Sequence, residues 1–203
     1  DPKTYEHINP DEVGNARNIV VSDQSGQSNI MSRLNAIGIN IKKDDPKIKK
    51  LLHEVKDREY IGYSYDGADA SFELLARRLM GEIPRYISIN EYDVSVKKDS
   101  TGEVISFAKA KLEVDGHEIL CEGEGNGPVN ALDNAIRKNV NKLEKYSEYL
   151  KDLKLVDYKV RILNTGTGAV TRVSIESADS KHGNWFTIGV SPNIIEASFK
   201  ALV

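Results

Sequence analysis

The spacing of apolar residues changes near residue 85, and the predicted elements change with it. Between residues 44 and 82 the apolar positions follow the 3.6-residue period of a helix with one buried face, as do Ile48, Leu51, Leu52 and Val55. Asp45 and Pro46 suit the N-cap and first position of this helix. A second helix is predicted to begin near Asp66 or Asp69 and to stop at Gly81 and Pro84, and its apolar face carries Phe72, Leu74, Leu75 and Leu79.

The first 43 residues are polar and rich in Asn, Gly and Ser, unlike the segment that follows them. The run 18–22 predicts a short strand. Ser28 is expected to cap a short helix that ends at Gly38 and carries Ile30, Met31, Leu34 and Ile37. Residues 1–43 and 44–84 are therefore predicted to form two small, mainly helical units ahead of a larger domain.

From residue 85 the alternating pattern predicts strands, at 87–89, 92–96, 104–114 and 118–122. The junction 125–128, Gly-Asn-Gly-Pro, then leads into a helix. The order recurs with strands at 157–163, 170–177 and 184–190, and with the junction 189–192, Gly-Val-Ser-Pro. We therefore predict an α+β domain over 85–203 with two βββα repeats, about 85–150 and 154–203. Its strands would form one layer or two units facing each other across a pseudo-twofold axis.

Composition narrows the classes of function. The 203 residues include 28 basic and 31 acidic side chains and carry a net charge of −3, which argues against a general nucleic-acid binder. Tyr60, Tyr63 and Tyr65 could stack on single strands, but their acidic surroundings disfavour this. We expect no membrane span and no signal peptide. The chain opens on Asp1 without an initiator Met, so we expect it to be part of a longer protein.

No constellation for catalysis is visible. The single cysteine, Cys121, excludes a disulfide framework, fits a reducing cytoplasm and is expected to be buried. The four histidines lack ligand spacing, so we expect no metal site. Gly123, Gly125 and Gly127 do not form a dinucleotide fingerprint, because the strand before them is predicted to be antiparallel. A glycine turn before a helix nevertheless leaves free N–H groups that suit a carboxylate, such as that of a free amino acid; the alternative is a tight turn without a ligand.

Longer motifs carry a family resemblance over essentially the whole chain. The segments YEHINPDEVGN, SYDGADASFELLARR, GNGPVNALD and GVSPNIIEAS resemble the C-terminal part of the 2-isopropylmalate, citramalate and homocitrate synthase family, most closely its citramalate branch. The resemblance implies linker subdomains at 1–43 and 44–84 and a regulatory, dimerising domain at 85–203. It places acetyl-CoA condensation with a 2-oxo acid, and a divalent metal, in an N-terminal barrel absent from this chain. We expect the chain to hold no cofactor and to be inactive alone.

The resemblance also implies site residues. Tyr5 matches a linker tyrosine that reaches the neighbouring subunit's active site. A branched-chain amino acid is expected to bind near the dimer interface, with Asp157 or a backbone carbonyl accepting its ammonium group. The implied effector residues are Gly125, Gly127, Val129, Asn130, Leu155, Tyr158, Ile162, Ala169, Val190 and Pro192.

The effector's identity rests on two departures from the family pattern. Asn130 and Ile162 are bulkier than their counterparts in leucine-binding relatives, which favours isoleucine over leucine. A leucine-binding regulatory domain of the isopropylmalate branch and a purely structural dimerisation domain remain alternatives. The expected partners are a second copy of the chain, the effector and the N-terminal barrel, without nucleic acid or membrane.

Overall fold

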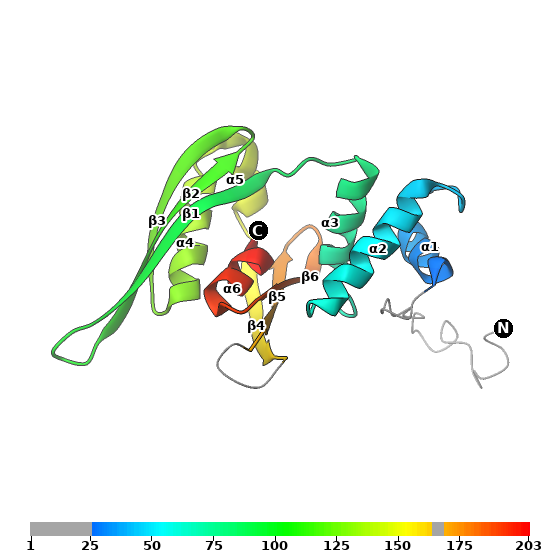
Figure 1. The fold of residues 1–203 in the computed structure, drawn as a ribbon. Coiled ribbons are helices and arrows are strands. Elements are labelled where there is room, and N and C mark those ends of the chain that lie inside the picture. The colour runs from blue at the N-terminus through cyan, green and yellow to red at the C-terminus, as the bar shows by residue number, and fades with distance from the viewer. Residues whose placement is uncertain (1–25, 164–168) are drawn as a thin grey trace.

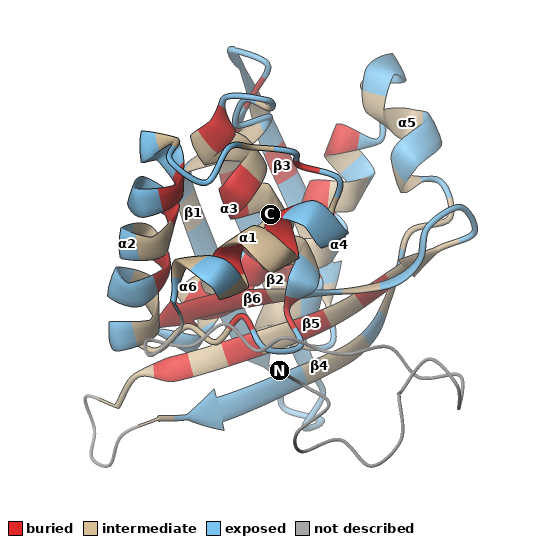
Figure 2. Cartoon of the chain, turned by 90° about the vertical axis from the view of Figure 1, so that its right-hand side faces the viewer, coloured by how far each residue is buried: buried red, intermediate tan, exposed pale blue. Residues whose placement is uncertain are grey.

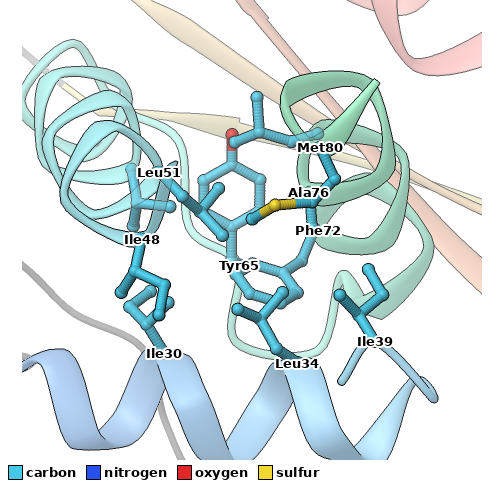
Figure 3. Packing of buried hydrophobic residues seen from close by; sticks show 11 residues of the cluster. Ile30, Leu34, Ile39, Ile48, Leu51, Tyr65, Phe72, Ala76 and Met80 are labelled. Atoms are coloured by element: carbon cyan, nitrogen blue, oxygen red, sulfur yellow. The ribbon is translucent and has the colours of Figure 1, made fainter. Parts of the chain in front are cut away.

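The computed structural model describes residues 26–163 and 169–203 (Figure 1). Tyr5 and the strand predicted at 18–22 lie outside these residues. Three helices come first: α1 (Gln27–Ala36), α2 (Pro46–Tyr60) and α3 (Asp69–Met80). They share one core, shown in Figure 3, in which Ile30 and Leu34 of α1 pack with buried residues of α2 and α3. A boundary near residue 43 therefore stays a prediction, because the helices on either side bury their apolar faces together.

Local signals set the ends of these helices, with one exception. The Asp45 carboxylate accepts the Lys47 amide at 2.8 Å, so it caps α2 as predicted. Gly81 ends α3 in the left-handed conformation at φ +78°, which glycine adopts without strain. The expectation for Ser28 is wrong: Gly26 is the N-cap of α1, and Ser28 lies inside the first turn. Arg33 joins α1 to α3 by an ion pair with Asp69.

Two three-stranded antiparallel sheets follow, which confirms the α+β class and the duplicated βββα pattern. The first unit contains β1 (Ile87–Lys98), β2 (Val104–Val114), β3 (His117–Gly125), α4 (Pro128–Val140) and α5 (Glu144–Leu150). The second contains β4 (Lys154–Ile162), β5 (Thr171–Asp179), β6 (Gly183–Ser191) and α6 (Ile194–Leu202). The sheets remain separate, so the single-layer arrangement is wrong. The strands predicted at 87–89 and 92–96 are one strand with a bulge between Ile89 and Glu91.

The register reveals which positions are equivalent in the two repeats. A bulge separates Leu155 from Asp157 just as one separates Ile89 from Glu91, and Tyr158 and Tyr92 follow these bulges. A Cβ on Gly123 would collide with the α4 backbone, and one on Gly189 with the α6 backbone. Gly123 and Gly189 are thus the equivalent glycines, at which each helix lies flush on its sheet. The sequence prediction paired Gly125 with Gly189, and this alignment of the repeats is wrong by two residues.

The outer faces of the two sheets differ. No residue of the central strand β5 is exposed, as its red and tan colours in Figure 2 show, whereas the central strand β2 of the first sheet carries exposed residues. On the first sheet this face carries exposed ion pairs, among them Lys109 with Glu122 at 2.7 Å. On the second sheet it is covered by the segment around α3: the Ser71 hydroxyl accepts the Ile188 amide at 2.9 Å, and Arg172 donates to the Gly62 carbonyl at 2.6 Å. The strand β5 and the second half of β6 are therefore enclosed between α6 and the linker helices, whereas the edge strand β4 is mostly exposed.

Candidate functional site

The N-terminus of α4 is open. Its N-cap, Gly127, has extended backbone and no side chain to cap the helix, and Pro128 has no N–H. The Ala131 amide donates to the Gly127 carbonyl at 2.9 Å. The amides of Val129 and Asn130 donate no hydrogen bond within the described part of the chain. These two N–H groups, at the positive end of the helix dipole, are suited to bind an anion.

Close packing holds this turn in place. A Cβ on Gly125 would collide with the Asn130 side chain and with the Ala131 amide, so only glycine lets α4 start so near β3. The Asn130 side-chain oxygen Oδ1 accepts the Asn126 amide at 3.2 Å, which fixes the loop. In contrast, nothing lies within 4 Å of a Cβ on Gly127. The space in front of the free amides is therefore unobstructed.

The N-terminus of α6 is closed by its own side chains. The Asn193 side chain accepts the amides of Ile195 at 2.8 Å and Glu196 at 3.3 Å. The Ser191 hydroxyl in turn accepts the Asn193 amide at 3.2 Å, and Pro192 is exposed ahead of the helix. The helix donors that a carboxylate would use are thus already bonded. Of the two glycine turns, only the first leaves the second and third amides of its helix free.

A second group of predicted residues lies on β4. Tyr158 stands opposite the buried Ile175, on the face that α6 covers, and its hydroxyl lies 2.8 Å from the Ser198 hydroxyl. Leu155 packs partly buried in the same cluster. Ile162 is 67% exposed at the end of the strand, and Ala169 is half-buried before β5. Leu155 and Tyr158 therefore have a packed environment, whereas Ile162 presents a bare apolar side chain.

Val190 and Asp157 lie on the other face of the second sheet. Val190 stands opposite Arg172, is 5% exposed, and would touch a Cβ on Gly62. It packs against the linker rather than beside Tyr158. Asp157 forms an ion pair with Lys159 at 2.6 Å, which lowers the pKa of its carboxyl. Within one chain the sheet separates both residues from the Tyr158 side.

The predicted residues thus form two half-sites in a single chain. One half-site is the start of α4, with Gly125, Gly127, Val129 and Asn130; the other is the α6-facing side of β4. Among the described residues α4 and β4 share no extensive packing, and α6 lies between α4 and the second sheet (Figure 1). Within the described part of one chain, these two surfaces therefore do not adjoin each other.

Two residues of this region, Tyr92 and Ser198, were not predicted from the sequence. The Tyr92 hydroxyl donates to Glu196 of α6 at 3.0 Å, and burial together with this carboxylate raises the pKa of Tyr92. Its ring lies 5.0 Å from that of Phe199. Ser198 is fully buried and binds Tyr158. Tyr92 could have been found from its equivalence to Tyr158, but the sequence-based alignment of the two repeats was incorrect and did not pair these tyrosines.

Other predicted features are simpler. Cys121 is a free thiol with 1% exposure, as predicted, and burial raises its pKa. Over residues 26–163 and 169–203, no three His, Cys, Asp or Glu side chains gather as metal ligands would. None of the described helices is both long and apolar enough to cross a bilayer.

Comparisons with known proteins bear on the whole chain. A family model described as the LeuA allosteric (dimerisation) domain matches residues 66–203, and one described as homocitrate synthase post-HMGL domain-like matches residues 1–61. An (R)-citramalate synthase of Aquifex aeolicus is 46% identical over 98% of this chain and 38% of its own length. That of Geobacter sulfurreducens is 43% identical over 100% of the chain and 38% of its own length.

The chain thus spans about two fifths of the length of the curated relatives it matches. The resemblance seen in the sequence motifs is confirmed, including its similarity to the citramalate branch. The family model for the allosteric domain covers more than half of the chain. The chain therefore belongs to the LeuA allosteric (dimerisation) domain family.

Proposed function

We propose that this chain is the linker and regulatory region of a citramalate synthase-type acyltransferase, and that its dimer binds a branched-chain amino acid, isoleucine first, as a feedback inhibitor. The observation that carries the proposal is the open N-terminus of α4, which contrasts with the self-capped N-terminus of α6. A free amino acid carries the carboxylate that such an open terminus suits.

The effector is held by both half-sites. Its carboxylate accepts the amides of Val129 and Asn130, and its apolar side chain packs against Leu155, Tyr158 and the exposed Ile162. Burying a side chain of this size contributes about 1.5–3 kcal/mol. Ala169 and Pro192 border the pocket, and Val190 supports the sheet from behind. A second copy of the chain completes the site, which fits a dimerisation domain whose half-sites lie apart in one protomer.

Binding is transmitted through the second sheet. The effector stabilises one arrangement of β4 and β5, and Arg172 on β5 is bonded to the Gly62 carbonyl of the linker. A shift of the sheet therefore shifts the linker helices, which in the whole enzyme lie next to the catalytic barrel. Tyr5, outside the described residues, is proposed to reach the partner subunit's active site. The barrel would supply the divalent metal and condense acetyl-CoA with a 2-oxo acid in the cytoplasm, which suits the free thiol of Cys121.

Titration calorimetry with isoleucine, leucine and valine, combined with sedimentation for the oligomeric state, tests this function. We expect a dimer that binds isoleucine saturably and more tightly than leucine. Tyr158→Phe, which removes only the hydroxyl bonded to Ser198, should weaken binding about three- to ten-fold. Tyr149→Phe, at an exposed position of α5, is the matched control and should change nothing.

Each other outcome has a definite meaning. Preference for leucine would move the chain to the isopropylmalate branch. A folded dimer that binds none of the three amino acids would contradict the effector site and favour a structural dimerisation domain. Acetyl-CoA turnover by the isolated chain would contradict the assignment of catalysis to the absent barrel.

A further inference from the structure

A large cleft runs between the linker helices and the C-terminal domain, and none of the proposed effector residues lines it. Its volume is about 1060 Å³, and its walls come from α2, α3, β1, β6 and α6. Apolar side chains make up much of the lining, including Leu75, Leu79, Ile87 and Ile89. A cleft of this size and character is of the kind that holds small ligands.

Arg58, Arg78 and Arg85 line this cleft, and of these three only Arg58 forms an ion pair within the described residues. Arg78 of α3 is partly buried, and its Nε is enclosed without a hydrogen-bond partner in the described structure. Burial, Arg85 and Arg58 all lower the pKa of Arg78. A desolvated guanidinium next to two further positive charges is costly unless an anion joins it.

The carboxylates that line the cleft are already engaged. Glu54 accepts Arg58 at 2.6 Å, and Asp57 lies 3.4 Å from His53. Glu196 accepts the Tyr92 hydroxyl and forms an ion pair with Lys200. No ion pair of Arg78 or Arg85 is found in 26–163 or 169–203. The positive charge of Arg78 therefore stays uncompensated within this part of the chain.

The phenol of Tyr65 lines the same cleft as Arg78. Tyr65 is 1% exposed, and its hydroxyl, at the end of the ring far from α1 in Figure 3, makes no well-formed hydrogen bond among the described residues; its polar neighbour is the guanidinium of Arg58. Burial raises the pKa of Tyr65 to about 12, and the nearby Arg58 opposes the rise. A buried hydroxyl without a partner costs about 1–3 kcal/mol, so it is rare unless a ligand or water satisfies it.

We propose that this cleft binds a small organic carboxylate with an apolar body, held by Arg78 and by the Tyr65 hydroxyl. The carboxylate would compensate the guanidinium and accept the phenol's hydrogen, while the apolar body would lie along Leu75, Leu79 and Ile89. The site is separate from the proposed effector site, because neither Gly127 nor Tyr158 lines this cleft. It also does not depend on the proposed function.

Titration calorimetry of the 203-residue chain at low ionic strength tests the site, with benzoate and inorganic phosphate as probes. We expect saturable benzoate binding that Arg78→Gln weakens about ten-fold and Tyr65→Phe about three-fold. Because the phenol makes no well-formed hydrogen bond in the described fold, Tyr65→Phe should leave thermal stability unchanged or raise it, which keeps the test valid if Arg78→Gln folds poorly. Tyr60→Phe and Arg161→Gln, at exposed positions elsewhere, should bind benzoate like the parent chain.

Absence of saturable benzoate binding would overturn the proposal, as would equal weakening by the control variants. Phosphate binding at the same residues without benzoate binding would overturn the assignment to a carboxylate. Isoleucine binding should be the same in Tyr65→Phe as in the parent chain. A loss of isoleucine binding with Tyr158→Phe alone would thus concern the effector site and not this cleft.

Discussion

The two repeats share a skeleton, but their helices begin in opposite ways. In each repeat a bulged edge strand places a tyrosine on the helix-facing side, and a glycine lets the helix lie flush on the third strand. The helix of the second repeat is then capped by Asn193, whereas that of the first begins at Gly127 with its donors free. The two repeats share one scaffold, and the residue at one cap position decides whether the helix N-terminus is self-capped or open.

The outer faces of the two sheets also differ, because only that of the second sheet is covered by the linker. The second repeat covers this face with the linker, through Ser71 and Gly62, while the first leaves it to exposed ion pairs. The first repeat therefore leaves helix donors free, which the proposed effector site would use, and the second contacts the linker helices. Four sets of substitutions test this difference between the two repeats.

The largest expected effect is at the shared glycines. Gly123→Ala and Gly189→Ala both place a Cβ into helix backbone, and overpacking of this kind should lower the free energy of unfolding by about 3 kcal/mol in each. Denaturant unfolding measures it. Gly26→Ala, with open space and φ −82°, is the control: it only replaces the glycine N-cap of α1 by alanine and should cost no more than about 1 kcal/mol. A tolerated Gly189→Ala would show that α6 is not held flush on its sheet.

The connection between linker and second sheet should be the next most sensitive. Gly62 has φ +114°, and a Cβ there would meet Leu163 and Val190. Gly62→Ala should therefore weaken linker docking by about 2 kcal/mol through strain and collision. Hydrogen exchange should report faster exchange in α3 and β6 together. Faster exchange in the first sheet instead would contradict this path.

Exchanging the caps should give smaller and opposite effects. Asn193→Ala removes the cap of α6 and should cost about 1 kcal/mol of stability. Gly127→Asp adds a cap at extended backbone with open space, and should raise stability by about 0.5–1 kcal/mol. Thermal unfolding measures both. Destabilisation by Gly127→Asp would mean that the turn is less open than its geometry indicates.

The exposed ion pairs of the first sheet should matter least. The Glu122 carboxyl has its pKa lowered by Lys109, so the pair can stabilise the fold only above the carboxyl's ordinary pKa and loses this contribution as pH falls through the lowered value. Both side chains are mostly exposed, and solvent screens their attraction. Lys109→Gln should leave the unfolding midpoint unchanged within error at neutral pH. A clear loss of stability would indicate that this face is buried in a dimer.

The sequence was informative where one local rule decides the structure. Asp45 before Pro46, Gly81 after α3 and the alternation in β2 each specify a cap, a stop or a face, and all three were predicted correctly. The break between α4, which ends at Val140, and the separate short helix α5 was not predicted. The pattern of charges does not record where tertiary packing interrupts a helix.

The site residues could likewise be predicted only where the local sequence determines their environment. The free donors at Gly127 follow from the chain itself, because a glycine N-cap and a proline leave amides unbonded. The faces of Val190 and Tyr158 do not, since a bulge in β4 and the true alignment of the repeats decide them. The uncompensated Arg78 and the unpaired Tyr65 depend on contacts between helices that are far apart in sequence, and no local pattern marks them.

Isoleucine titration of three chains tests the central claim that the open start of α4 holds the effector's carboxylate: the parent, Gly127→Asp and Asn193→Asp. The two variants add the same charge at equivalent cap positions of the two repeats. We predict that Gly127→Asp weakens isoleucine binding at least about ten-fold while folding normally, and that Asn193→Asp binds like the parent. Equal binding by all three chains, or a loss confined to Asn193→Asp, would contradict the account.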